Sequence, residues 1–328
     1  MSGPVAFARG LVERIARRPW TAPTSAPWLS QVLGQGPPLG RLGDVAWTEH
    51  ALAAGSAASM DDFVDRLGTL ITRGARPYGV VGDSHSRMLV RRARRGGDWL
   101  LPLWSLETGA SARGLARAEA RSGAGGRTRD VLRRLLALDG VPVLTLFGQV
   151  DIEFVHTFKR LTGGQRVFHV EEFDAFADET AKAYVAFLAE AVAPHLRARV
   201  WVCPVLPPAL SDAAWRRGYL NAHLVALHGQ GSPEDVAVRL ADLEIPDLAH
   251  RTRLHVSFNT RLARVAASEG FSSLDPFSTL VGLDGVVKSA FLGAAAGGDH
   301  HMDFAATRAP VLESLWRLMD EGTSRFPG

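Results

Sequence analysis

Short apolar segments recur along the chain after residue 75, and the clearest of them run without an alternation of apolar and polar positions. A strand that is covered on both faces has this near-continuous pattern, whereas a half-exposed strand alternates. We predict five strands on this basis, the last one short: 77–81, 98–107, 141–147, 199–205 and 271–277.

Between these segments, apolar positions recur at every third or fourth residue, which is typical of an amphipathic helix. In the segment 59–74, Ser59 and Asp62 fit a capping box, and Gly74 fits the helix end. Further helices are predicted at 128–140, 173–195, 232–243, 254–270 and 304–318. Strands that alternate with helices at this spacing predict an α/β fold of three layers, with helices on both faces of a parallel sheet.

The chain divides into two parts by composition. Residues 1–75 contain a stretch dense in proline and glycine followed by the first predicted helix, and we interpret them as an N-terminal helical and Pro-rich extension. Residues 76–328 carry the strand and helix pattern and form the predicted catalytic domain. Within it, the pattern loosens at 206–253, which we interpret as an inserted lid near the active face.

Composition excludes several classes of protein. The 37 basic and 34 acidic residues give a net charge of +3, which is too balanced to make nucleic acid the main partner. A single cysteine, Cys203, excludes an intrachain disulfide and a cysteine-rich zinc module, and its apolar strand predicts an inert buried thiol. No apolar run reaches the length of a membrane span, and arginines interrupt the N-terminal apolar patches, so we expect a cytoplasmic protein.

Candidate chemistry begins where the first predicted strand ends, in Gly82-Asp83-Ser84-His85. Ligands of open parallel sheets bind at the carboxyl ends of the strands, and Ser84 would also begin the following helix. A serine there can attack a carbonyl, and its own backbone N–H can help to hold the oxyanion. It needs a base, usually a histidine that a carboxylate orients, and a glycine-rich loop supplies Asp299, His300 and His301.

The early Gly-Asp-Ser block and the late Asp-His cluster together resemble the SGNH/GDSL hydrolase superfamily, over roughly residues 76–318. The resemblance implies a flavodoxin-like three-layer α/β/α fold. It makes Ser84 the nucleophile and Asp83 its neighbour, and it makes Gly109 a backbone donor to the oxyanion. The family places Asp three residues before the basic His. Here Asp299 precedes His301 by two, so we expect His301 to be the base and Asp299 to orient it, with His300 as the rival base.

The third family block, Gly-x-Asn-Asp, departs from the family pattern in this chain. The segment "GQVD" matches it at Gly148 and Asp151 but has Val150 where the family has the asparagine that donates to the oxyanion. Valine cannot donate a hydrogen bond, so Gln149 or a backbone amide would have to replace that donor. Losing one such donor costs about 3 kcal/mol of transition-state stabilisation.

Within the superfamily, the combination of Gly-Asp-Ser-His-Ser, Phe-Gly-x-x-Asp and Asp-His-His is similar to bacterial proteins of surface-polysaccharide and glycan modification. This resemblance implies an esterase or acyltransferase that acts on an O-acyl group, such as O-acetyl, of a carbohydrate, without a metal ion or organic cofactor. Trp99, Trp104 and Trp215 could stack on sugar faces. The sequence leaves open whether water or a sugar hydroxyl accepts the acyl group, and it leaves open the oligomeric state.

Three other interpretations remain. Asp83 and His85, with 299–301, could hold metal ions in a metal-dependent phosphoesterase, although the Gly-Asn-His block of such enzymes is missing. The chain could instead be a glycan-binding protein that keeps the fold and has lost turnover. In the plainest interpretation, Asp83 caps a helix and Asp151 accepts hydrogen bonds from buried backbone amides.

Overall fold

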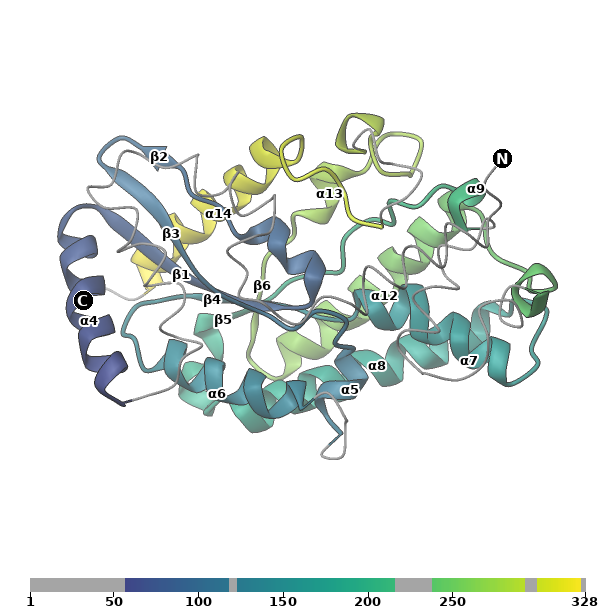
Figure 1. Cartoon of the computed structure of the whole chain (residues 1–328), viewed down its shortest axis with the longest axis horizontal. Helices are drawn as coiled ribbons and strands as arrows, with labels where there is room; N and C mark the ends of the chain where they lie inside the picture. The colour runs from purple at the N-terminus through teal and green to yellow at the C-terminus, as the bar shows by residue number, and fades with distance from the viewer. Residues whose placement is uncertain (1–56, 118–122, 216–237, 293–299, 326–328) are drawn as a thin grey trace.

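The computed structural model describes residues 57–117, 123–215, 238–292 and 300–325. In these ranges the chain forms a six-stranded sheet with helices on both faces (Figure 1), so the predicted α/β class is confirmed. The strand order is β2-β3-β1-β4-β5-β6. The strands are β1 (Ala75–Gly82), β2 (Arg94–Arg95), β3 (Asp98–Leu106), β4 (Val143–Leu146), β5 (Val200–Val202) and β6 (Ser272–Ser273).

The sheet is mixed rather than wholly parallel, which corrects the sequence-based prediction. β1 pairs in parallel with β3 on one side and with β4 on the other, and β5 and β6 continue the parallel order. The edge strand β2 runs antiparallel to β3 through a tight turn at Gly96, whose φ is +63°. The sequence has no strand signal there because both residues of β2 are exposed arginines.

Each face of the sheet has its own apolar core. Val80 and Val81 are adjacent in β1 and fully buried, and they belong to different core clusters, one on each side of the sheet. Neighbouring side chains of a strand point to opposite faces, so a strand covered on both sides needs apolar residues at successive positions and not only at every second one. This requirement explains the continuous apolar runs in the sequence.

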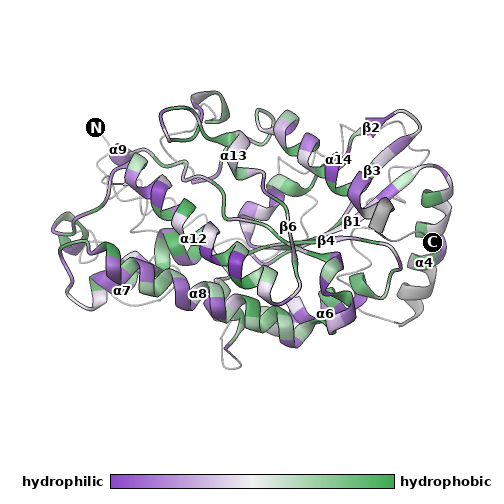
Figure 2. Cartoon of the chain, turned by 180° about the vertical axis from the view of Figure 1, so that it is seen from behind, coloured by the Kyte–Doolittle hydropathy of each residue, from purple (hydrophilic) through white to green (hydrophobic). Residues whose placement is uncertain are grey.

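Two groups of helices cover these faces. One face packs against α4 (Ala57–Thr72), α5 (Ala112–Leu115), α6 (Ala124–Leu136), α8 (Val170–Ala191) and α12 (Leu248–Ser268). The other face packs against the 3-10 helix η2 (Ser84–Leu89), α13 (Phe277–Leu280) and α14 (Arg308–Arg325). Figure 2 shows hydrophobic and hydrophilic residues interspersed around α8 and α12, as expected of amphipathic helices with one buried side.

The helix predicted in the N-terminal extension packs onto the sheet. Leu67 and Leu70 of α4 are buried in the larger core cluster, and Gly74 follows the helix with a φ of +87°. Helix α4 begins at Ala57, before the capping box proposed at Ser59. Residues 1–56, which hold the Pro-rich stretch, lie outside the described residues.

The region predicted as a lid is partly described. Residues 216–237 lie outside the described ranges, and so does part of the helix predicted at 232–243. The described parts contain α9 (Asp212–Ala214) and the start of α12. Leu210, Trp215 and Leu240 pack there in a third apolar cluster with Phe154 of the π-helical turn η3 (Asp151–Val155). η3 continues directly into α7 (His156–Thr162), and η4 (Pro194–Arg199) and η6 (Ser289–Phe291) are further short helical elements.

Within the described ranges, no helix is both long and apolar enough to cross a bilayer.

Candidate active site

Backbone packing at the end of β1 requires glycine at position 82. Gly82 lies in register with Leu106 of β3 and Leu146 of β4. A Cβ atom at position 82 would lie 2.4 Å from the carbonyl oxygen of Leu146 and 2.5 Å from Cβ of Ser86. The chain can therefore turn at once from the strand into η2, and this turn places Ser84 at the carboxyl edge of the sheet.

Asp83 caps this turn, as the plainest interpretation of the sequence predicts. Its Oδ1 accepts the backbone N–H of His85 at 2.8 Å and lies 3.2 Å from Nδ1 of the His85 ring. The Ser86 hydroxyl donates to the Asp83 carbonyl at 2.7 Å. Asp83, His85 and Ser86 are buried, whereas Ser84 between them is partly exposed. The sequence predicts a regular helix after Ser84, but the structure has one short 3-10 helix, which ends at Leu89.

The late histidine segment meets this turn. Nε2 of His301 lies 2.9 Å from Oγ of Ser84, across 217 positions of sequence. His300 is more deeply buried, and its ring packs edge-on against Phe154 at 5.4 Å between centroids. Of the two histidines expected to compete for Ser84, the structure therefore brings His301 into hydrogen-bond contact with it. Asp299 lies outside the described residues.

Three imidazoles form a compact group beside Ser84. The ring centroids of His300 and His301 are 3.8 Å apart, and the His85 centroid lies 4.8 Å from that of His300 and 4.5 Å from that of His301. One ring nitrogen from each lies within 4.8 Å of the other two, which is close enough for the group to hold a metal ion. The sequence grouped these histidines as possible ligands of a metal site with Asp83 and Asp299, and the structure brings the three histidines together.

Arg91 links η2 to the segment that carries His301. It is fully buried, and its guanidinium carbon lies 3.5 Å from the ring centroid of Phe304. Its Nη2 donates to Oγ1 of Thr307 at 3.1 Å, and its Nε donates to the carbonyl of Met88 at 2.9 Å. Burial lowers the pKa of Arg91 to about 9. A run of arginines such as that at 91–95 is typical of a solvated helix face, and the structure shows the opposite for Arg91.

Asp151 organises the loop that follows β3. It is fully buried, and its carboxylate accepts the backbone N–H groups of Ala112 at 2.5 Å and Arg113 at 3.2 Å. Burial raises the pKa of Asp151 to about 7, against the opposing effect of these two hydrogen bonds. Asp151 thus satisfies buried backbone amides, as the plainest interpretation predicts.

Gly109 lies in the loop that Asp151 holds. The loop starts beside the turn at Asp83 and Ser84, because the N–H of Glu107 donates to the carbonyl of Gly82 at 2.7 Å. Gly109 is partly exposed and has a φ of +75°, a conformation that side-chain-bearing residues rarely adopt. Gly109 therefore lies at the carboxyl edge of the sheet, two residues after the contact with Gly82.

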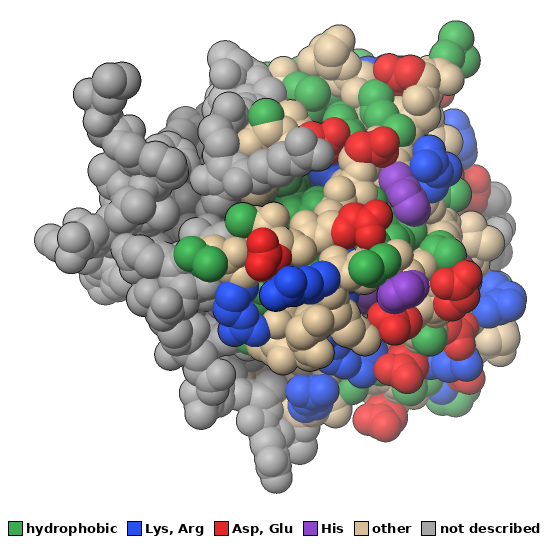
Figure 3. All heavy atoms as spheres, turned by 90° about the vertical axis from the view of Figure 1, so that its right-hand side faces the viewer, with side chains coloured by type: hydrophobic (Ala, Val, Ile, Leu, Met, Phe, Trp, Pro, Cys, Tyr) green, Lys and Arg blue, Asp and Glu red, His purple; other side chains and the backbone are tan. Residues whose placement is uncertain are grey.

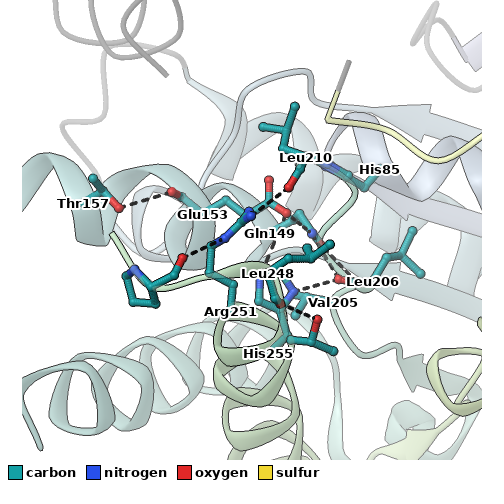
Figure 4. Close-up of polar contacts among 12 residues, drawn as sticks. His85, Gln149, Glu153, Thr157, Val205, Leu206, Leu210, Leu248, Arg251 and His255 are labelled. Atoms are coloured by element: carbon teal, nitrogen blue, oxygen red, sulfur yellow. Dashed lines mark hydrogen bonds and ion pairs between the residues drawn. The ribbon is translucent and has the colours of Figure 1, made fainter. Parts of the chain in front are cut away.

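Gln149 uses its side-chain amide within the protein. Its Nε2 donates to Oε1 of Glu153 at 2.8 Å and to the carbonyl of Leu206 at 3.1 Å, and its Oε1 accepts the N–H of Leu206 at 2.7 Å (Figure 4). Both amide hydrogens therefore have protein acceptors. In this arrangement Gln149 holds the loop after β5 and has no hydrogen left for an oxyanion.

A small cavity lies next to Glu153, and sequence reasoning assigned no role to the polar residues that line it. The cavity has a volume of about 30 Å³ and is lined by Glu153, His156, Arg160, Arg251 and His255, among others. A volume of this size holds about two water molecules. Among the described residues, Oε2 of Glu153 and Nη1 of Arg251 are buried without a hydrogen-bond partner. Glu153 follows Gln149 by four residues, about one helical turn, and this spacing is the sequence feature that could have pointed to the polar residues of the cavity.

The cavity residues have perturbed pKa values. Burial lowers the pKa of His255 to about 3 and that of His156 to about 4, and it raises the pKa of Glu153. His255 is held by a hydrogen bond between its Nδ1 and the carbonyl of Leu206 at 2.8 Å. Since a carbonyl only accepts, Nδ1 carries the proton, and Nε2 faces Glu153 at 3.9 Å. His255 is therefore neutral near pH 7.

Two further expectations concern the tryptophans and the single cysteine. Trp99, Trp104 and Trp215 are buried, so they pack in the cores instead of presenting faces to a sugar. Cys203 is also fully buried, and burial raises the pKa of its thiol, as expected of an inert core cysteine.

The surface at the α7 and α12 end of the molecule carries mixed charge. Acidic, basic and histidine side chains are interspersed among the described residues of this face (Figure 3). A nucleic-acid-binding surface gathers positive charge on one face instead.

Comparisons with known proteins give no more than a weak structural likeness. No family model matches the sequence, and no curated protein matches it. Among solved structures, the crystal structure of the OSK domain of Drosophila Oskar is similar at a TM-score of 0.35 with 13% sequence identity. That match covers 73% of this chain and 88% of the OSK chain. A TM-score this low does not show a common fold.

Proposed function

We propose that the chain is a serine-dependent acyl-transfer enzyme of the SGNH type. The observation that carries the proposal is the 2.9 Å contact between Oγ of Ser84 and Nε2 of His301. A nucleophile and base within hydrogen-bond reach are the core of this chemistry. The partial exposure of Ser84, at the carboxyl edge of a mostly parallel sheet, adds to this support.

In the proposed reaction, Ser84 attacks the ester carbonyl while His301 removes the hydroxyl proton. The tetrahedral intermediate collapses when His301 returns that proton to the leaving alcohol, which leaves an acyl group on Ser84. Water or a second alcohol then attacks the acyl-enzyme, and His301 again takes and returns a proton. We assign Asp299 the role of orienting His301, as the family resemblance implies.

Backbone amides supply the proposed oxyanion site. The N–H groups of Ser84 and Gly109 are its donors, and Asp151 contributes indirectly by fixing the loop that carries Gly109. Gln149 is not included, because its amide hydrogens already have acceptors. The proposed oxyanion site therefore has these two backbone donors and lacks the side-chain amide that the family's asparagine supplies at the position of Val150.

We propose an O-acyl group of a carbohydrate as the substrate, from the motif resemblance. The test is labelling by a fluorescent fluorophosphonate, which reacts with activated serines. Wild-type protein is expected to label, and Ser84→Ala is expected to lose all labelling. His301→Gln should reduce the labelling rate at least about 100-fold, in keeping with the effect of removing a general base. Equal labelling of the wild type and the Ser84→Ala variant would refute the proposal.

Metal-dependent hydrolysis is a second candidate, because three histidines meet in one place. Asp83 engages the backbone and ring of His85 through its Oδ1, while its Oδ2 is buried without a hydrogen-bond partner among the described residues. The two candidates differ in one measurement. Removal of metal by a chelator abolishes turnover of a phosphodiester in the second case and leaves fluorophosphonate labelling intact in the first.

A further inference from the structure

The three-histidine cluster of His85, His300 and His301 has the composition of a metal site and lies against the proposed nucleophile. A ring nitrogen of each histidine lies within 4.8 Å of the other two. His85 and His300 are buried, and His301 is partly exposed. An ion could therefore reach the cluster from the side of Ser84 and be held by nitrogen atoms that are shielded from bulk water.

A second observation points to a ligand for His85. Its Nδ1 lies 3.2 Å from Oδ1 of Asp83, and a carboxylate that accepts there places the ring proton on Nδ1. The lone pair is then on Nε2, which is buried and has no hydrogen-bond partner among the described residues. A carboxylate behind the imidazole and an unsatisfied nitrogen in front are the arrangement of metal-binding histidines.

We propose that His85, His300 and His301 bind one Zn²⁺ ion and that this ion inhibits the enzyme. Imidazole nitrogen favours Zn²⁺ over oxygen-seeking ions such as Mg²⁺. Three histidines leave one position of a tetrahedral ion open for water, and nitrogen ligands about 2.1 Å from Zn²⁺ lie about 3.4 Å apart. The ring nitrogens, which lie within 4.8 Å of one another, therefore need to approach by up to about 1.4 Å, through rotation about the side-chain bonds of the histidines.

Inhibition follows from the single lone pair of a neutral imidazole, and it rests on the proposed function. If Zn²⁺ binds Nε2 of His301, the lone pair that would accept the Ser84 proton is used. If Zn²⁺ binds Nδ1 instead, the ring proton must be on Nε2, which then donates to Ser84 and cannot accept from it. Either mode of binding removes the base.

The experiment measures zinc affinity by competition with a colorimetric chelator, in protein without a polyhistidine tag. We expect His85→Gln and His300→Gln each to weaken binding at least about tenfold, and Asp83→Asn to weaken it about 10- to 100-fold through the loss of the carboxylate behind His85. His195→Gln is the matched control, because His195 is an exposed histidine of η4, and it should bind as the wild type does.

Co²⁺ gives a readout that needs no variant, because a tetrahedral histidine site gives visible absorption bands that Zn²⁺ displaces. Wild-type affinity in both His85→Gln and His300→Gln would overturn the site, and so would wild-type protein without Co²⁺ bands. Fluorophosphonate labelling is then followed against zinc concentration. A labelling rate that falls in step with zinc occupancy supports inhibition, whereas a constant rate or an increase overturns it.

The failure of the site and the failure of the proposed function give different results. The Ser84→Ala variant should bind Zn²⁺ with wild-type affinity, because the hydroxyl is not a ligand. Metal-free wild-type protein that never labels would refute the serine mechanism and leave the affinity measurements unchanged.

Discussion

Arg91 and Thr307 are 216 positions apart, and the guanidinium of the first donates to the hydroxyl of the second at 3.1 Å in the interior of the protein. This contact joins the segment that follows Ser84 to the segment that follows His301. Arg91 follows η2, which begins at Ser84, and Thr307 comes shortly after His301 in the sequence. The Ser84–His301 distance therefore depends on how firmly Arg91 holds the two segments together.

The first prediction tests whether Arg91 holds the two segments together. Arg91→Ala removes two hydrogen bonds and the stacking on Phe304, and it leaves a buried void. We expect a loss of about 3 kcal/mol in the free energy of unfolding, measured in urea. At a temperature where the variant is folded, labelling of Ser84 should slow at least about tenfold because the base is displaced. Arg94→Ala, at an exposed position of β2, is the control and should change neither quantity. Equal effects of the two substitutions would show that Arg91 does not hold the two segments together.

The second prediction separates reactivity from stability within one turn. Ser84 is partly exposed, so Ser84→Ala should change the free energy of unfolding by less than about 0.5 kcal/mol while labelling is lost. Ser86 is buried and donates to the Asp83 carbonyl at 2.7 Å. Ser86→Ala should therefore cost about 1 kcal/mol and keep labelling. A melting temperature that falls more for the Ser84 variant would mean that Ser84 is structural.

Much of the fold could be predicted because local pattern and tertiary environment agree. The apolar runs that contain Val80 and Val143 predict strands covered on both faces, and both faces of the sheet are indeed covered. β2 escaped prediction because its partner β3 provides the pairing while its own arginines are exposed. A strand of two residues is too short to show an alternation of apolar and polar positions. A strand that forms because its neighbour pairs with it therefore cannot be recognised from the sequence pattern.

The candidate site, like the fold, could be predicted only in part. Ser84 could be placed at a strand end from its local sequence. His300 and His301 could be chosen as candidate bases because a reactive serine needs a histidine. The sequence could not decide which of His300 and His301 meets Ser84, because the directions of adjacent loop side chains are set by tertiary packing. The burial of Arg91 could not be predicted either, because an arginine next to other arginines favours solvent unless a distant segment satisfies it, as Thr307 does.

The third prediction concerns Gln149. Gln149→Ala leaves the backbone N–H and carbonyl of Leu206 without this partner in a buried position. We expect a loss of about 3 kcal/mol in the free energy of unfolding and a change of less than about threefold in labelling rate. If Gln149 donated to the oxyanion, its removal would slow labelling about 100-fold or more. Gln165→Ala, at an exposed position, is the control for both measurements.

The fourth prediction is a pH dependence that comes from Asp151. Its pKa is about 7 in the folded protein against 3.8 for the ordinary side chain. Between these values the folded protein keeps the proton and the unfolded chain has released it. The free energy of unfolding therefore falls as the pH rises from about 4 to about 7, and this contribution stays level above about pH 7.

Asp151→Asn removes that dependence. We expect the free energy of unfolding of the wild type minus that of the variant to be about 2 to 3 kcal/mol larger at about pH 5 than at about pH 8, measured by urea denaturation. The other titrating groups are common to both proteins and cancel in the difference. A stability difference that is the same at both pH values would show that Asp151 is ionised throughout.

The last prediction uses two glycines with opposite surroundings. Gly82→Ala places a methyl group 2.4 Å from the Leu146 carbonyl oxygen, and because that atom belongs to the backbone, the strand end itself must move. We expect a loss of about 3 kcal/mol in the free energy of unfolding, at the upper end of the cost of overpacking, together with slower labelling of Ser84.

Gly126 is the matched position, because it lies exposed within α6 and a methyl group there would meet no atom within 4 Å. Gly126→Ala should raise the free energy of unfolding by about 0.5 to 1 kcal/mol, because alanine loses less conformational entropy than glycine in a helix. Opposite signs for the two variants in thermal and urea unfolding would tie the Gly-Asp-Ser turn to close packing between β1 and β4. A neutral Gly82 variant would show instead that the strand end adapts at little cost, and the placement of Ser84 would then not depend on glycine at this position.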